Sequence, residues 1–274
     1  MLAALAGVVS LGLGYLYVGR PRAAFLPLVG VVGATAVVGW TRLILEPAVF
    51  YAAGLLSVLI WLFSIVHPAV IAFRLGTQPA RPFNRWWVYV VWIVGFGILS
   101  SQVVEHRAVL FGFQPFRMAS ASMSPTIQRD EWVMVDTWRF RRTPPAINEM
   151  VVLSVPRKPG AVYLFRVVGL PGDKLKIRDD VLVRNGSDVN EPFKTLLDSP
   201  SPMRSSFGPI VLPADHYLVL GDNRHRAYDS RALGAIHKDW LLGRVEYRWF
   251  AVEDGVVWSR FPEKLTTEDE PDDS

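Results

Sequence analysis

Two serine hydroxyls lie two residues apart in the stretch Met118–Thr126, just after the last long apolar run of the chain. Ser120 and Ser122 stand among small side chains, and Pro125 follows closely. A plain linker can have this composition. A serine held on an exposed, strained loop can also attack a carbonyl carbon, if a neighbouring base accepts its proton. The stretch is therefore a candidate nucleophile loop, and its chemistry depends on a base from elsewhere in the chain.

Two later stretches complete a specific pattern. Residues 163–173 run from a strand-like Tyr-Leu-Phe-Arg-Val-Val into Gly-Leu-Pro-Gly-Asp. Residues 221–234 begin with Gly-Asp-Asn-Arg and continue through Tyr-Asp-Ser-Arg to a glycine. Together with the serine stretch, in this order and spacing, they closely resemble type I signal peptidases (peptidase S26), the membrane serine endopeptidases that remove signal peptides from exported preproteins. The resemblance covers residues 105–250.

The resemblance implies roles for individual residues. Ser122 would be the nucleophile, and the Ser120 hydroxyl would form the oxyanion hole together with the Ser122 backbone N–H; such donors contribute roughly 10²–10³ in rate. Asp229 and Arg231 match a charge pair that braces the site, and Arg166 is a further structural residue. Six apolar residues match the shallow pockets for small substrate side chains at positions −1 and −3, although each would also suit core packing: Phe116, Met118, Ala119, Ile127, Tyr163 and Leu164.

The base of the family is missing from its expected position. Family members use a lysine, kept neutral in an apolar pocket, one residue before the arginine of the second stretch. Here that residue is Phe165, which cannot accept a proton. The serine that orients the lysine is replaced by Ala227. Because a buried hydroxyl without its partner costs ~1–3 kcal/mol, the two replacements together indicate apolar repacking of the base pocket.

A histidine could serve as the base instead, since a neutral imidazole accepts a proton near neutral pH. The candidates are His106, His216, His225 and His237. His225 is the nearest to the site in sequence, but we expect it to be an ordinary exposed loop residue. Lys174 and Lys176 follow the Pro-Gly-Asp turn and are expected to point away from Ser122.

The sequence is therefore compatible with two functions of different classes. One is a signal peptidase that works with a non-standard base or by weak, base-free catalysis. The other is a catalytically inactive family member that binds signal peptides or acts as a membrane scaffold or assembly factor. A membrane-anchored β domain with an unrelated role is disfavoured by the pattern of the three stretches.

Four apolar runs precede the serine stretch. A helix needs roughly 20 apolar residues to cross ~30 Å of hydrocarbon. The runs are free of Asp, Glu, Lys and Arg, and they cover residues 1–19, 23–40, 47–73 and 86–104. The first run lacks the basic start of a cleaved signal peptide. It could cross the membrane completely or, because it contains several glycines, form a re-entrant segment.

Basic residues in short loops mark the cytoplasmic side. Such arginines lie between runs one and two and between runs three and four: Arg20, Arg22, Arg74, Arg81 and Arg85. We expect four crossings with the N-terminus outside, so that residues 105–274 lie on the extracytoplasmic side of the cell membrane. The expected domains are three helices and a cytoplasmic linker (1–85), a fourth helix (86–104), a signal-peptidase-like β domain (105–262) and an acidic disordered tail (263–274).

The sequence after residue 131 alternates short strand-like runs with turn signals. Asn185-Gly186 is a strong hairpin signal, and residues 187–209, rich in Pro and Ser, suggest a surface excursion. No apolar stripe of helix length occurs there. The fold class that follows is a membrane protein with N-terminal transmembrane helices and a mainly β domain, built as a closed or partly closed barrel.

Composition narrows the functions further. The 274 residues carry a formal net charge of +4 and include no cysteine. The lack of cysteine excludes disulfides, thiolate metal sites and Cys nucleophiles. No long Lys- and Arg-rich run occurs, so no nucleic-acid partner is expected. The expected partners are signal peptides and the lipid bilayer, with no metal ion and no cofactor.

Overall fold

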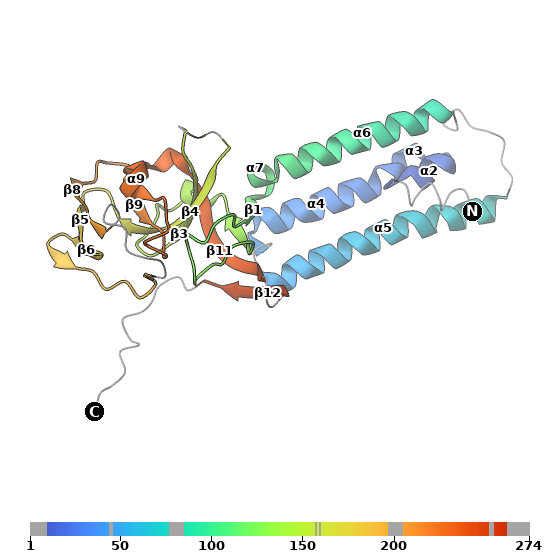
Figure 1. Cartoon of the computed structure of the whole chain (residues 1–274). Coiled ribbons are helices and arrows are strands. Elements are labelled where there is room, and N and C mark those ends of the chain that lie inside the picture. Colours follow the sequence, from blue (N-terminus) through green and yellow to red (C-terminus); the bar gives the residue numbers. More distant parts are fainter. Residues whose placement is uncertain are drawn as a thin grey trace. The chain divides into compact units, whose positions relative to one another are not determined.

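The chain folds as two compact units, residues 1–113 and 114–274 (Figure 1). The computed structural model describes residues 10–43, 46–76, 85–156, 158, 160–196, 205–251 and 255–261. The predicted tail at 263–274 lies outside the described residues, as does most of the linker before residue 85.

The first unit is a bundle of apolar helices. In chain order they are α2 (Leu13–Tyr17), α3 (Pro21–Ala24), α4 (Leu26–Trp40), α5 (Pro47–Leu75), α6 (Trp86–Glu105) and α7 (Arg107–Phe111). Pro21 and Pro47 each occupy the first turn of a helix, where the missing N–H would have had no intrahelical partner. Among the described residues, three segments are long and apolar enough to cross a membrane: Pro21–Trp40, Pro47–Leu75 and Trp86–Glu105.

The first apolar run is not one long helix in its described part. Residues 1–9 lie outside the described residues, and the helix that follows, α2, has five residues. Gly12 precedes it at φ +82°, and a Cβ there would lie 2.0 Å from the Ala24 carbonyl oxygen. Only glycine fits this turn, which brings α2 back against α3.

Contacts place three chain segments at one end of the bundle. Leu16 and Ala24 are buried with Ile71, near the end of α5, and with Val88 and Trp92, near the start of α6. The Tyr15 hydroxyl and His67 Nδ1 are also hydrogen-bonded at 2.8 Å. The turn between α2 and α3, the end of α5 and the start of α6 therefore lie together.

The second unit is built on a curled sheet, which has eight strands in the described part of the chain. Its order is β1-β2-β11-β3-β4-β9-β10, and β12 pairs with β11. The strands are β1 (Phe113–Arg117), β2 (Trp132–Asp136), β3 (Met150–Ser154), β4 (Val162–Gly169), β9 (His216–Leu220), β10 (Ile236–His237), β11 (Leu241–Ala251) and β12 (Gly255–Arg260). Neighbouring β3 and β4 are antiparallel, with Val151 opposite Phe165.

A smaller sheet follows the Pro-Gly-Asp turn. Its order is β7-β6-β5-β8, with the strands β5 (Lys174–Arg178), β6 (Val181–Arg184), β7 (Ser187–Asp188) and β8 (Phe207–Val211). The hairpin predicted at Asn185-Gly186 joins β6 to β7, and both residues have positive φ. Within the predicted surface excursion at 187–209, β7 and the start of β8 pair in this sheet, while both residues of β7 and also Gly208 and Pro209 are exposed.

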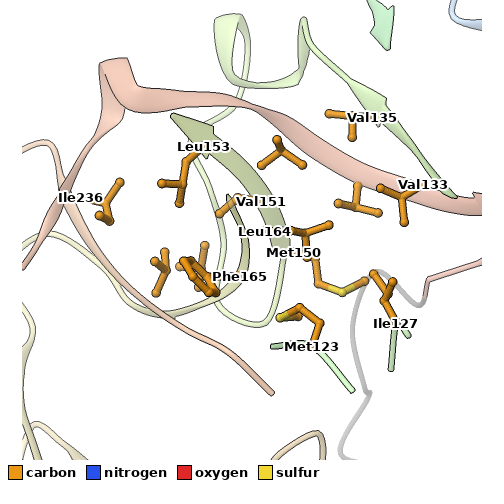
Figure 2. Close-up of a cluster of buried hydrophobic side chains, with 14 of the residues drawn as sticks. Met123, Ile127, Val133, Val135, Met150, Val151, Leu153, Leu164, Phe165 and Ile236 are labelled. Atoms are coloured by element: carbon orange, nitrogen blue, oxygen red, sulfur yellow. The ribbon is translucent and has the colours of Figure 1, made fainter. Parts of the chain in front are cut away.

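Short helices complete the second unit: η3 (Arg139–Arg141), α9 (Ser230–Leu233) and η4 (Lys238–Trp240). The main core lies inside the curled sheet. Apolar side chains from β2, β3, β4 and β9 meet there, together with Met123 and Ile127 from the serine stretch (Figure 2). The mainly β architecture expected from the alternating strands is present, and the serine stretch is anchored in its core.

Candidate active site

Ser122 lies on the loop between β1 and β2, which we call the serine loop (residues 118–131). Its ends are tied together, since the Met118 N–H donates to the Glu131 carbonyl at 2.8 Å and the Asp130 N–H donates to the Met118 carbonyl at 2.7 Å. Met123 and Ile127 are fully buried in the core. Apolar anchors next to Ser122 thus hold a polar loop on the surface of the barrel.

The two serines of the loop contact each other. Ser120 Oγ and Ser122 Oγ are 3.0 Å apart and hydrogen-bonded. Ser120 is exposed, whereas Ser122 is only 7% exposed. In the part of the chain that the structure describes, no Lys or His side chain hydrogen-bonds to Ser122 Oγ. The arrangement offers a nucleophile and a neighbouring hydroxyl donor, without a side-chain base bound to the nucleophile.

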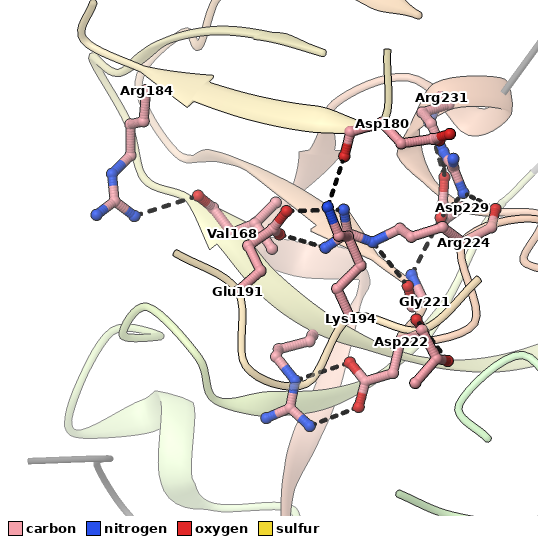
Figure 3. Close-up of polar contacts among 12 residues, drawn as sticks. Val168, Asp180, Arg184, Glu191, Lys194, Gly221, Asp222, Arg224, Asp229 and Arg231 are labelled. Carbon is pink, nitrogen blue, oxygen red and sulfur yellow. Dashed lines mark hydrogen bonds and ion pairs between the residues drawn. The ribbon is translucent and has the colours of Figure 1, made fainter. Parts of the chain in front are cut away.

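A buried ion pair fixes the back of the serine loop. Arg166 donates from Nε and Nη2 to the two carboxylate oxygens of Asp222, at 2.8 and 2.7 Å. The side chains are 7% and 3% exposed. Figure 3 shows the dashed contacts to the two carboxylate oxygens of Asp222. Asp222 also accepts a hydrogen bond from Thr126 Oγ1 at 2.6 Å, and the Asn223 N–H donates to the Ser122 carbonyl at 3.0 Å. Charge-assisted, bidentate pairs of this kind are the strong ones, so they define the position of the loop.

Residues 193–195 also hold the serine loop. Thr195 Oγ1 donates to the Ser124 carbonyl at 2.8 Å, and the Thr195 N–H donates to the Asp222 carbonyl at 2.8 Å. Phe193 places its ring 3.7 Å from the Arg166 guanidinium carbon. Neither Thr195 nor Phe193 was predicted from the sequence. No local signal marks them, because their partners are far away in the sequence.

A second set of charges braces the loop that carries Asp222. Asp229 is fully buried and accepts from Arg231 Nε at 2.9 Å, from Arg231 Nη2 at 2.7 Å and from the Gly221 N–H at 3.0 Å. Arg224 pairs with Glu191 (Figure 3). Asp229 thus links the Arg231 side chain to the backbone of Gly221.

Gly221 lies in close contact with both Ala227 and the serine loop. A Cβ on this residue would lie 2.3 Å from Ala227 Cβ and 2.6 Å from the Ser122 carbonyl oxygen. No side chain fits there without moving backbone. The same contacts place Ala227 beside the serine loop, at the location where the resemblance puts the partner of the family's lysine.

The position of that lysine is filled by an aromatic ring. Phe165 is 2% exposed and Ala227 is 3% exposed, and both belong to the main core. Figure 2 shows Phe165 among aliphatic side chains that include Val151 and Ile236. The ring also stacks on Tyr163, with centroids 5.9 Å apart. The ring is thus packed within the apolar core.

Tyr217 belongs to the main core and carries a phenol hydroxyl, which could accept a proton only in its ionised form. Burial, and then the nearby Asp215, raise the pKa of its phenol above the ordinary 10.0, and Lys238 lowers it by less. Tyr217 therefore stays protonated at neutral pH and does not replace the missing base.

The structure corrects the expectation for His225. Its side chain is buried rather than exposed, and Nε2 lies 3.3 Å from Asp180 Oδ2, at the turn between β5 and β6. The reason is that the loop after Asp222 packs against the smaller sheet, so a residue in a loop becomes an interface residue. Lys174 and Lys176 are exposed on β5.

The six residues matched to the substrate pockets fall into two groups. Met118, Ile127 and Leu164 are buried in the main core. Phe116 and Tyr163 are half-buried against that core, and Ala119 is exposed. Only the second group has surface that a bound peptide could contact in this conformation.

Comparison with known proteins places this site in a family. The family model described as signal peptidase, peptidase S26, matches residues 86–250. Signal peptidase I P of Bacillus subtilis subsp. natto is 34% identical over 167 residues, which cover 57% of this chain and 87% of the relative. Signal peptidase I of Bacillus licheniformis is 34% identical over 164 residues, covering 56% of this chain and 85% of the relative.

A solved structure of signal peptidase I from Enterococcus faecalis V583 aligns with 37% of this chain and 97% of its own, at 27% identity and a TM-score of 0.32. The assignment rests on the family model and the sequence relatives. The family model spans the serine loop, β4 with Phe165 and the loop that carries Asp222 in one match. The chain belongs to the signal peptidase family, peptidase S26.

Proposed function

We propose that this chain removes signal peptides from exported preproteins with Ser122 as nucleophile, at a rate far below that of a signal peptidase with a lysine base. The observation that carries the proposal is the 3.0 Å contact between Ser120 Oγ and Ser122 Oγ, on a loop held by the buried pair of Arg166 and Asp222. Membership of the signal peptidase family supplies the substrate class, a preprotein with small residues at −1 and −3.

The chemistry follows from these atoms. Ser122 Oγ attacks the scissile carbonyl carbon, the C–N bond breaks, and water then hydrolyses the acyl-enzyme ester. The Ser120 hydroxyl and the Ser122 N–H stabilise the oxyanion, each contributing roughly 10²–10³ in rate. Because Phe165 has no basic atom, the Ser122 proton passes to water, and the leaving amine nitrogen takes up a proton from water as the C–N bond breaks. Loss of a triad-type member costs about 10⁴–10⁶ in rate and leaves residual catalysis.

A second function is favoured by the packing of the base pocket. Phe165 and Ala227 are almost completely buried in continuous apolar contacts, which suits a family member that binds signal peptides without cleaving them. Such a protein would act as a membrane scaffold or assembly factor. The two functions share the peptide-binding surface and differ only in the chemical step.

One experiment separates them. The full chain, purified in detergent, is incubated with a preprotein that has Ala at −1 and −3, and cleavage is followed over hours. We expect slow cleavage at the signal-peptide junction that disappears in Ser122→Ala, while crosslinking to the signal peptide persists. Crosslinking without any cleavage would establish the second function. If the chain showed neither crosslinking nor cleavage, both functions would be contradicted. His225→Ala serves as the control, with unchanged rates expected because His225 pairs with Asp180.

We further propose that the protein is a multi-pass membrane protein with residues 114–274 on the extracytoplasmic side. The turn holding Arg20 and Arg22 lies at the same bundle end as the end of α5 and the start of α6. That end is the basic one, and Glu105 lies at the other end of α6. The orientation is thus the same whether or not the first apolar run crosses the membrane.

The native chain has no cysteine, so single cysteines can report this topology. Ser187→Cys, in the exposed strand β7, should react with a membrane-impermeant maleimide in intact spheroplasts. Arg85→Cys should react only after permeabilisation. The reverse pattern would overturn the proposed orientation.

A further inference from the structure

An apolar cavity of about 360 Å³ opens in the helical unit, between the segment α2–α4 and helix α6. We call it the α4–α6 groove. Its walls are hydrophobic, with Leu16, Phe25 and Leu28 on one side and Val91, Gly95 and Leu99 on the other. Helix α6 buries none of its residues in the described part of the protein, so the groove is open along the helix.

The lining decides what can fill the groove. Trp92 is the lining residue with a polar hydrogen, and its Nε1 already donates to the Leu11 carbonyl at 3.1 Å. A cavity without polar partners does not retain ordered water. In a bilayer, the hydrocarbon around the helices is the material available to occupy it. The walls therefore fit an acyl chain.

Three arginines surround one end of the groove. Arg20 and Arg22 flank Pro21, which lines the cavity, and Arg85 lies one helical turn before Val88, which also lines it. All three are exposed. Across residues 10–43, 46–76 and 85–113, no described carboxylate forms an ion pair with any of them. A concentration of unpaired positive charge thus lies at the mouth of an apolar slot.

We propose that the α4–α6 groove binds an anionic phospholipid, with an acyl chain between the helices and the phosphate held by Arg20, Arg22 and Arg85. Basic pockets between membrane helices on the cytoplasmic side suit such headgroups. Charge argues against a signal peptide as the occupant, because its n-region is basic and would meet the same arginines. The inference does not depend on whether Ser122 is catalytically active.

The test uses the full chain in detergent and counts bound lipid by native mass spectrometry. The probes are phosphatidylglycerol and phosphatidylcholine with identical acyl chains, which differ in headgroup charge. Phosphatidylglycerol should bind more tightly, and Arg85→Gln should weaken it about fivefold, the effect of one arginine near a charged lipid. The matched control is Arg74→Gln, at the end of α5, which removes the same charge away from the groove lining and should leave binding unchanged.

A second pair of variants tests the groove itself. Gly95 lines the cavity, and a Cβ added there meets nothing within 4 Å. Gly95→Leu should therefore fold normally and exclude the acyl chain, abolishing lipid retention. Gly97→Leu is the control, because a Cβ on Gly97 is equally unobstructed but does not face the cavity.

Three results would overturn the proposal. The first is equal binding of the two lipids by the native chain. The second is an equal loss in Arg85→Gln and Arg74→Gln, which would indicate only a general charge effect. The third is capture, by a photo-crosslinker placed at Val91 in cells, of a signal peptide or of a second copy of the chain in place of lipid.

Discussion

The two sides of Ser122 differ in kind. On one side, charged and polar groups fasten the serine loop: Arg166 and Asp222 form a bidentate pair, and Thr195 bonds to the Ser124 carbonyl. On the other side, Phe165 and Ala227 fill the base pocket with apolar atoms. The polar side determines where Ser122 lies, and the apolar side determines whether its proton has an acceptor.

The difference indicates that the positioning of Ser122 and its activation by a base depend on separate sets of residues in this fold. Both sides are densely packed, so neither resembles a decayed surface. A buried charge network is retained only when each member is satisfied, and Asp222 alone accepts from both Arg166 and Thr126. The contacts that hold the serine loop thus involve neither Phe165 nor Ala227.

The largest expected effect comes from rebuilding the apolar side. Phe165→Lys together with Ala227→Ser should raise the cleavage rate about 10²–10⁴-fold, the usual contribution of a general base. Desolvation in this pocket would lower the pKa of the new lysine and keep it neutral. Cleavage of the preprotein with Ala at −1 and −3 measures the gain, and Ser122→Ala in the same background must remove it. A folded double variant that stays at the native rate would mean that the polar side does not hold a productive geometry.

A change on the polar side should instead reduce stability. Asp222→Ala leaves the Arg166 guanidinium buried and unpaired, which typically costs 3–5 kcal/mol, about the value for one broken buried pair. Urea unfolding of the full chain in detergent, followed by tryptophan fluorescence, measures it. Asp215→Ala removes the surface pair with Lys238, whose side chains are about half exposed, and should cost about 0–1 kcal/mol. Equal losses in the two variants would refute the special role given to the buried pair.

The smallest effect concerns Thr195. Thr195→Val keeps the shape of the side chain and removes the donor to the Ser124 carbonyl, at a cost of about 1 kcal/mol. In the variant with Lys at 165 and Ser at 227, it should also lower kcat more than it raises KM, because the serine loop loses one of its fixed points. Thr195→Ser retains the hydroxyl and should restore both values. If serine and valine variants behave alike, Thr195 acts through packing rather than through its hydrogen bond.

Much of the fold could be predicted from local patterns. The strands at Trp132, Met150 and Val162 follow from short runs of β-branched and apolar residues closed by turn residues, since such runs suit a half-buried pleated surface. The hairpin at Asn185-Gly186 follows from the tolerance of both residues for positive φ. The strands within the excursion were harder to predict, because β7 has only two residues and β8 pairs with β5, which is not its neighbour in the chain.

The sequence by itself indicated the family, and it predicted Ser122 as the nucleophile and Phe165 and Ala227 at the positions of the base and its partner, because these are matters of residue type and spacing. Tertiary structure alone decided that Thr195 and Phe193 reach the site, that His225 turns to Asp180, and that α6 leaves an apolar groove beside α4. These contacts join residues distant along the chain, and their energy depends on burial and on partner geometry. A local pattern specifies neither.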